Sequence, residues 1–369
     1  MVSIAVTGAR GFIGSNLAVQ LHERGFTVVP VPHEADDLES ILYDTDAVAH
    51  LAGVNRPRDE AEFATGNGDF TTRLATALKR LGRKLPVVYA SSIQAALDNP
   101  YGRSKRAAEA ALEAYSAETG APVAIFRLPN VFGKWCRPNY NSVVATFCFN
   151  ISHGLPISIT DPTRMLRLVY VDDVVARFTE VLRDPAAADE VPAVEPVYET
   201  SLGALAAQLE RFRDSRRTLV TGPVGTGLMR ALHATFLSYL DPAEFGYSLT
   251  RHTDPRGTFA EMLRTEDAGQ FSYFTAHPGI TRGGHYHHSK TEKFLVLHGK
   301  ARFGFRHILT GETYEIVTSG EEARVVETIP GWAHDITNIG EDTMVVMLWA
   351  NEVFDPDKPD TVAAKVLEA

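Results

Sequence analysis

The pattern of apolar and polar positions divides the chain into two parts that predict different secondary structure. In the first part, short apolar runs alternate with stretches of helical periodicity, beginning with a strand at Ser3–Thr7, a helix at Phe12–Arg24 and a strand at Phe26–Val31. The same alternation predicts strands at 47–51, 86–91 and 123–127 and helices at 70–81 and 101–119. Alternating β and α elements predict a Rossmann-type, doubly wound parallel sheet with helices on both faces.

The texture changes after Asp241-Pro242. Two helical stretches, 201–212 and 225–240, precede this point. Beyond it, glycine and β-branched residues punctuate short apolar runs at 294–297, 301–305, 313–317, 324–329 and 343–349. Closely spaced short strands with turn residues between them predict a small all-β barrel. We therefore expect an α/β domain over residues 1–243 and a β-barrel domain over residues 244–369.

Composition and charge narrow the classes of partner. The net charge of −10 over 369 residues, with both signs spread along the chain, excludes nucleic acid as the main partner. An anionic ligand would need a local cationic cradle. Two cysteines, Cys136 and Cys148, fit a reducing compartment. No apolar stretch approaches the roughly 20 residues that span a bilayer, and the N-terminus lacks signal-peptide features, so we expect a cytoplasmic protein without a membrane partner.

A glycine-rich loop joins the first strand to the first helix. Glycines at such a turn allow a tight bend, close approach of the backbone to a pyrophosphate, and close helix–strand packing. The amide groups at the start of the helix then face the anion. The alternative is an ordinary glycine turn, but the strand–turn–helix context favours a dinucleotide site. The loop residues expected at the cofactor are Gly8, Arg10, Gly11, Phe12, Ile13 and Gly14.

The end of the second strand favours NADPH over NADH. NAD-binding proteins place an acidic residue there to hold the ribose 2′-hydroxyl, whereas this strand runs through Pro32-His33 before the first acid, Glu34. Arg10 in the glycine loop, with His33, suits a 2′-phosphate. The alternative is that Arg10 is a solvated surface charge.

A tyrosine and a lysine share one face of the helix that begins near residue 100. Tyr101 and Lys105 are four residues apart, and Ser91-Ser92 ends the preceding strand. A phenol titrates near pH 10 when unperturbed, so acid–base work near neutrality needs a cation close by, which Lys105 supplies. A serine hydroxyl at the strand end suits the substrate oxygen, and the doublet leaves open which serine it is.

With these motifs in place, about the first 240 residues resemble the extended short-chain dehydrogenases/reductases. Further matches are segments 50–53, 127–133 and 170–174, together with Asn67. The resemblance implies that Ser92, Tyr101 and Lys105 form the catalytic triad, with Ser91 as the rival to Ser92. It also implies that the cofactor is bordered by Leu51, Ala52, Gly53, Asn67, Pro129 and Asn130.

Four potential metal ligands gather in the second part of the chain. His285 and His287 project to the same face of a strand, Glu292 begins the next strand, and His334 lies on a distant one. Imidazoles with a carboxylate suit zinc, iron, nickel or manganese rather than calcium or magnesium, and we expect a divalent metal, with zinc first. The alternative is a histidine-rich surface turn.

The spacing of these residues resembles both halves of the cupin metal motif, including Gly279, Gly299 and Gly331. One departure is that the motif's proline position holds Ile329, with Pro330 shifted by one. A weaker match, segment 254–259, resembles the Asp-x-Arg-Gly-x-Phe stretch of deoxysugar 3,5-epimerases.

An extended reductase followed by a metal-type cupin is similar to the CapF-type family of bifunctional capsular polysaccharide enzymes. Segments 92–95, 132–142 and 351–356 support the match. The resemblance implies a UDP-linked 2-acetamido-2,6-dideoxy-4-hexulose as substrate, reduction by NADPH to UDP-2-acetamido-2,6-dideoxy-L-talose on the route to UDP-N-acetyl-L-fucosamine, and a homodimer. A 4-keto group acidifies the neighbouring C–H bonds, so the cupin is expected to invert C3 before the reductase removes the ketone.

Three alternatives remain at this level. The cupin is either an epimerase or a dimerisation module without catalysis, and its metal is either a Lewis acid or a structural ion. The α/β domain is either a reductase or another UDP-sugar epimerase or dehydratase on the same fold. A non-enzymatic NADP-binding protein is disfavoured by the tyrosine–lysine pair.

Overall fold

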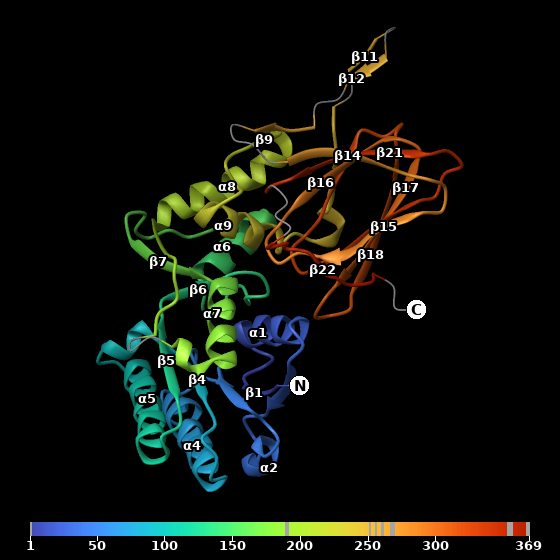
Figure 1. Ribbon diagram of the computed structural model, residues 1–369. Coiled ribbons are helices and arrows are strands. Elements are labelled where there is room, and N and C mark those ends of the chain that lie inside the picture. The colour runs from blue at the N-terminus through green and yellow to red at the C-terminus, as the bar shows by residue number, and fades with distance from the viewer. Residues whose placement is uncertain are drawn as a thin grey trace. The chain divides into compact units, whose positions relative to one another are not determined.

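A computed structural model describes residues 2–188, 192–250, 252–254, 257–259, 262–265, 270–352 and 357–366. The chain forms two compact units (Figure 1). The first unit comprises residues 1–142 and 165–200, and the second comprises 143–164 and 201–369. The helices at Val143–Ser152, Leu202–Thr218 and Gly227–Leu237 thus group with the C-terminal strands. The domain boundary at residue 243 stays a prediction.

A five-stranded parallel sheet in the order β2-β1-β3-β4-β5 forms the centre of the first unit. Its buried strands read as apolar runs, as expected for a sheet covered on both faces. The carboxyl ends of parallel strands meet at one edge, which brings the ends of β1, β3 and β4 together. The strands are β1 (Ser3–Thr7), β2 (Thr27–Val31), β3 (Ala47–His50), β4 (Val87–Ser92) and β5 (Val123–Leu128).

Helices pack in pairs around this sheet. Helix α1 (Phe12–Glu23) contacts α7 (Val171–Arg183), and α4 (Phe70–Arg80) contacts α5 (Pro100–Thr119), as Figure 1 shows. The start of α5 is fixed by Asn99, whose side chain accepts a hydrogen bond of 2.7 Å from the Gly102 amide. The expected doubly wound α/β fold is confirmed.

Shorter elements complete the first unit. Strands β6, β7 and β8 form a second, three-stranded sheet, in which β6 and β7 are parallel. The elements are α2 (Leu38–Leu42), α3 (Ala61–Phe63), a π-helical turn (Ala64–Asp69), a 3₁₀ turn (Ile93–Ala96), β6 (Asn130–Phe132), β7 (Met165–Tyr170), a 3₁₀ turn (Pro185–Ala187) and β8 (Val197–Ser201).

Two antiparallel five-stranded sheets form the barrel of the second unit, in the orders β10-β19-β16-β21-β14 and β18-β17-β20-β15-β22. The expected C-terminal all-β barrel of the cupin type is confirmed. The strands are β10 (Gly246–Ser248), β14 (Gln270–Ala276), β15 (Thr281–Tyr286), β16 (Glu292–His298), β17 (Lys300–His307), β18 (Thr313–Ser319), β19 (Arg324–Glu327), β20 (Trp332–Asn338), β21 (Met344–Ala350) and β22 (Val362–Ala363). Two small ladders join β11 (His252–Asp254) to β12 (Gly257–Phe259) and β9 (Val220–Thr221) to β13 (Arg264–Thr265).

Three helices of the second unit pack together: α6 (Val143–Ser152), α8 (Leu202–Thr218) and α9 (Gly227–Leu237). Helix α8 continues past residue 212, where its sequence becomes polar. The reason is tertiary, because Arg216 and Lys293 both pair with the buried carboxylate of Glu327. These ion pairs connect α8 to the barrel. An unpaired buried charge would be costly, and each of these charged groups has an oppositely charged partner. Among the described residues, no helix is long and apolar enough to cross a membrane.

Candidate active site and metal centre

The glycine loop after β1 is packed so tightly that side chains are excluded. Gly8 has φ +67°, and a Cβ there would lie 2.8 Å from the Ala52 nitrogen. A Cβ on Gly14 would lie 2.0 Å from the Gly8 oxygen. Gly11 precedes the first residue of α1, so the helix N-terminus opens at the loop, as an anion-binding turn requires.

A hydrogen-bond network behind the loop ties β1 to β3. Thr7 Oγ1 accepts hydrogen bonds of 3.0 Å from the amides of residues 51 and 52 and lies 2.7 Å from His50 Nδ1. His50 Nε2 lies 2.7 Å from Thr71 Oγ1, whose own proton goes to the Asn67 carbonyl. His50 Nε2 must therefore carry the hydrogen, and Thr7 donates to Nδ1. Burial lowers the pKa of His50 to about 3, so the ring is neutral.

The other predicted cofactor residues lie around this loop. Arg10 and His33 are exposed, and the His33 ring lies 4.5 Å from that of Phe70. Phe12 and Ile13 are half-buried in the first turn of α1. Their contact with a cofactor stays a prediction.

Asn67 fixes the segment after β3. Its side chain accepts from the Val54 amide at 2.8 Å and donates to the Val54 carbonyl at 3.0 Å. Gly53 is needed beside it, since a Cβ there would lie 2.8 Å from Asn67 Oδ1 and 3.4 Å from Lys105 Nζ. Pro129 is half-buried, and Asn130 donates to the Arg167 carbonyl at 3.2 Å. Asn67, Gly53 and Lys105 are thus brought together.

Strand β4 and helix α5 place Ser92, Tyr101 and Lys105 together. Ser92 lies close enough to the Tyr101 side chain to lower the pKa of its phenol, and Lys105 donates to the Ala90 carbonyl at 3.1 Å. The Lys105 ammonium lies 5.9 Å from the centre of the Tyr101 ring. Burial lowers the pKa of Lys105 to about 8, partly opposed by Glu109. Burial raises the pKa of Tyr101 and outweighs the lowering by Ser92, so the phenol keeps its proton at neutral pH.

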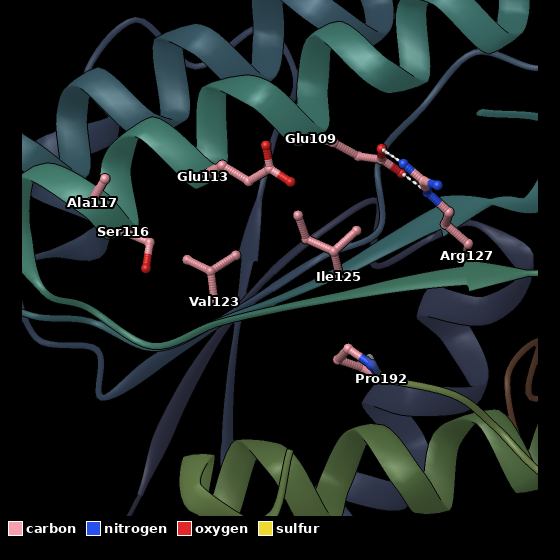
Figure 2. Close-up of a pocket in the computed structure, with 8 residues that line it drawn as sticks. All are labelled: Glu109, Glu113, Ser116, Ala117, Val123, Ile125, Arg127 and Pro192. Atoms are coloured by element: carbon pink, nitrogen blue, oxygen red, sulfur yellow. Dashed lines mark hydrogen bonds and ion pairs between the residues drawn. The ribbon is translucent and has the colours of Figure 1, made fainter. Parts of the chain in front are cut away.

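Ser91 has a different partner, which sequence reasoning did not find. Its hydroxyl donates to the buried carboxylate of Glu109 at 2.5 Å, and Arg127 forks onto the same carboxylate at 3.0 and 2.6 Å. Glu109 and Arg127 line a surface cavity of about 470 Å³ between α5 and β5. Figure 2 shows their ion pair at this cavity. Glu109 lies one helical turn beyond Lys105, and that spacing was the available signal.

The four predicted metal ligands converge inside the barrel. One ligand atom from each of His285, His287, Glu292 and His334 lies within 4.8 Å of the others. His285 and His334 are directly opposite each other on β15 and β20. His287 follows the end of β15, and Glu292 is the first residue of β16. The Glu292 carboxylate lies 3.1 Å from His287 Nε2 and 3.4 Å from His334 Nε2.

The protonation of this cluster suits a cation. Burial lowers the pKa of His285 to about 3, which leaves the imidazole neutral. Burial alone would raise the pKa of Glu292, but His287 and His334 outweigh it and hold that pKa well below its usual value. Neither ring nitrogen of buried His334 has a well-placed hydrogen-bond partner among the described residues. A neutral His285 imidazole, an ionised Glu292 carboxylate and buried His334 nitrogens without such a partner fit a divalent metal.

Asp360 builds the outer layer of the cluster, and no sequence motif pointed to it. Its backbone oxygen accepts from His287 Nδ1, which turns His287 Nε2 toward the cluster. Its carboxylate accepts from the consecutive amides of residues 288, 289 and 290 at 2.8, 2.7 and 2.7 Å. These bonds, together with His287 nearby, hold the pKa of Asp360 below its usual value against the effect of burial. The loop between two candidate ligands is thereby fixed.

Buried Lys134 and Asn338 have structural roles. Lys134 is buried and pairs with Asp172 at 2.7 Å. Asn338 accepts from the Gly340 amide and donates to the carbonyls of Ala276 and Asp342, which stabilises a turn. Parts of the epimerase-like segment 254–259 and of segment 351–356 lie outside the described residues.

Comparison with known proteins matches both halves of the chain. A model of the NAD dependent epimerase/dehydratase family matches residues 4–194, and a model of the polysaccharide biosynthesis C-terminal domain matches residues 252–362. The spore coat polysaccharide biosynthesis protein SpsL of Bacillus subtilis is 28% identical over 123 residues, which are 30% of this chain and 81% of that protein.

Two relatives match along their full length. The UDP-2-acetamido-2,6-beta-L-arabino-hexul-4-ose reductase of Pseudomonas aeruginosa is 56% identical over 370 residues, covering 100% of both chains. The crystal structure of the capsular polysaccharide assembling protein CapF from Staphylococcus aureus is 40% identical, with a TM-score of 0.68 over 99% of this chain and 100% of that one. The chain therefore belongs to the NAD dependent epimerase/dehydratase family, in the CapF-type form that continues into a polysaccharide biosynthesis C-terminal domain.

Proposed function

We propose that the chain is an NADPH-dependent reductase of a UDP-linked 4-keto sugar. The observation that carries the proposal is the placement of a half-buried phenol, Tyr101, close to Ser92 and with the ammonium of Lys105 5.9 Å from its ring centre. The full-length similarity to a UDP-2-acetamido-2,6-beta-L-arabino-hexul-4-ose reductase supports the same reaction class. The substrate proposed is a UDP-2-acetamido-2,6-dideoxy-4-hexulose.

The side chains divide the work of reduction. When bound, NADPH would supply a hydride to C4, which oxidises the cofactor to NADP⁺ and converts the C4 carbonyl into an alkoxide. Ser92 holds the ketone oxygen, and Tyr101 donates its proton to that oxygen as charge develops. Lys105 stabilises the resulting phenolate and returns a proton to it. A raised phenol pKa suits this direction, because the group must hold its proton until hydride arrives.

The glycine loop supports the cofactor assignment. The tight Gly8–Gly14 packing leaves room for a backbone approach to pyrophosphate at the N-terminus of α1. In this proposal Arg10 and His33, both exposed, hold the 2′-phosphate of NADPH. The segment at Leu51–Gly53 and the pair Pro129-Asn130 border the nicotinamide half.

The histidine cluster supports a second activity, epimerisation at C3 by the barrel. His285, His287, Glu292 and His334 would hold a divalent metal, with zinc the first expectation. When bound, such a metal supplies Lewis-acid stabilisation of an enolate oxygen. Epimerisation precedes reduction, since only the ketone acidifies the C3 hydrogen. The product is then UDP-2-acetamido-2,6-dideoxy-L-talose, and a cytoplasmic homodimer stays a prediction.

One pair of assays tests both activities. The protein is incubated with the 4-keto UDP-sugar in deuterated water, with and without NADPH, and mass spectrometry follows deuterium at C3 while absorbance follows NADPH. Deuterium uptake without NADPH and stoichiometric NADPH oxidation support both proposals. NADPH oxidation without deuterium uptake leaves a reductase with a non-catalytic barrel. Turnover without net NADPH consumption points to an epimerase or dehydratase instead.

A further inference from the structure

Two arginines share one aromatic ring in the first unit. The guanidinium carbons of Arg56 and Arg137 lie 5.9 and 5.3 Å from the centre of the Tyr140 ring. Both arginine side chains are exposed, and Tyr140 is half-buried. In the described part of the chain, neither guanidinium has an ion-pair or hydrogen-bond partner. Two like charges are therefore held together without a counterion.

Both segments border the residues assigned to reduction. Arg56 lies two residues after Val54, whose amide and carbonyl both hydrogen-bond to the Asn67 side chain. That side chain lies next to Gly53 and Lys105. The same stretch continues to Phe63, whose ring lies 5.5 Å from that of Tyr101. The Arg56 side of the pair thus belongs to the surroundings of the Tyr101–Lys105 site.

The segment that carries Arg137 is held in an unusual conformation. Trp135 and Asn139 have φ of 68° and 53°, in the left-handed region that non-glycine residues seldom occupy. Between β6 and Tyr140 the chain is anchored by buried Lys134, through its ion pair with Asp172 and a hydrogen bond from Asn16 to its carbonyl. Strained backbone that is this well anchored is typical of ligand-binding loops.

A dianionic group is the ligand that matches this arrangement. The chain as a whole carries a net charge of −10, so an unpaired cationic pair is a local exception. Guanidinium groups bind phosphate oxygens in a bidentate manner, and two of them suit two linked phosphates. The glycine loop already offers a separate site for the cofactor's pyrophosphate.

We propose that Arg56 and Arg137, stacked against Tyr140, bind the diphosphate of the sugar-nucleotide substrate at the reductase site. This inference rests on the proposed reductase function. The pair sets affinity for the nucleotide part of the substrate and takes no part in proton or hydride transfer.

The test is Arg56→Met and Arg137→Met, assayed by NADPH oxidation. Each substitution is expected to raise KM for the 4-keto UDP-sugar about tenfold, and the Ki of UDP as a competitive inhibitor by a similar factor, since each removes a charge-assisted contact. The KM for NADPH and deuterium uptake at C3 are expected to stay unchanged. Arg137→Lys keeps the charge but loses the fork, so its effect is expected to be smaller.

Arg58→Met is the matched control, because Arg58 is exposed on the same segment two residues away and, among the described residues, makes no cation–π contact with Tyr140. Unchanged KM and Ki in both test variants, with a wild type that reduces the sugar, overturn the inference alone. A raised KM for NADPH instead assigns the pair to the cofactor and also overturns it. If the wild type oxidises no NADPH, the reductase proposal fails. Calorimetric titration with UDP then tests the arginine pair by itself. The inference requires that the wild type binds UDP and that the double variant does not.

Discussion

The two candidate sites contrast in how the chain assembles them. In the first unit, the contacts of Ser92, Tyr101 and Lys105 join one strand to the helix that follows it, at neighbouring residues of each. In the second unit, His285, His287, Glu292 and His334 come from three strands and a loop, and Asp360 reaches them from near the end of the chain. A site built within one strand–helix pair depends on local geometry. A site built from distant segments depends on the strand register and on whatever cation it holds.

The largest expected effect separates the two sites directly. Tyr101→Phe removes the proposed proton donor and is expected to lower kcat for NADPH oxidation about 10³-fold, since positioned acids contribute about 10²–10⁴-fold. Deuterium uptake at C3 should continue at the wild-type rate. Loss of both activities in a folded variant would contradict two independent sites, with circular dichroism as the check on folding.

The second effect addresses the barrel. His334→Gln removes one of four candidate ligands and is expected to lower metal affinity by more than about 100-fold, a larger loss than outer-layer changes cause. Metal content by mass spectrometry and deuterium uptake at C3 should fall together. His288→Gln is the matched control, because His288 directly follows the candidate ligand His287 in sequence but lies outside the cluster. Equal metal loss in both variants would argue against His334 as a ligand.

A smaller effect tests the outer layer. Asp360→Asn keeps an acceptor oxygen but removes the charge that holds three consecutive amides, and metal affinity is expected to fall about tenfold. A competition titration with a chelating dye measures it. Asp357→Asn in the same segment serves as the control. NADPH oxidation with C3-inverted substrate should not change, because Asp360 lies in the other unit.

The smallest effect concerns pH. Burial lowers the pKa of Lys105 to about 8, Glu109 opposes that shift, and Tyr89, Tyr101 and His50 also lie nearby. The proposed reduction uses the protonated amine of Lys105, so kcat should fall as pH rises through about 8. Glu109→Gln removes the opposing charge and should move this fall to lower pH.

The matched control for that change lies one turn farther along the helix. Glu113 is exposed on α5 at the same surface cavity (Figure 2), so Glu113→Gln should leave the pH profile unaltered. Arg127→Met, which removes the partner of Glu109, should shift the profile less than Glu109→Gln does. An unshifted profile in Glu109→Gln would show that this carboxylate does not set the Lys105 pKa.

Much of the fold was predictable because local pattern and tertiary structure agree. The apolar runs became β1, β3, β4 and β5 nearly residue for residue, since buried parallel strands are continuously apolar. The end of α8 was predicted too early, because its last turn is polar and is stabilised by the distant Glu327. The metal-ligand set was proposed from spacing, and the structure places those four side chains together.

The supporting residues could not be predicted, because their partners are distant in sequence. Asp360 contacts the loop after β15 across a long stretch of chain, and nothing in its own segment marks it. Arg56 and Tyr140 meet only through the fold. Glu109 is the exception, since it continues the spacing of Tyr101 and Lys105 along one helix. Short-range spacing therefore identified the residues proposed to react. The residues that position them could be identified only from the three-dimensional structure.

The His50 network gives the first unit a built-in spectroscopic probe. Its imidazole is locked in one tautomer between Thr7 and Thr71 and remains neutral far below physiological pH. In a ¹⁵N-labelled sample its two ring nitrogens should therefore resonate at distinct, pH-independent frequencies while surface histidines move. Because Thr7 also anchors the backbone beside Gly8, a change in those frequencies on adding a dinucleotide would report occupancy of the loop without any turnover.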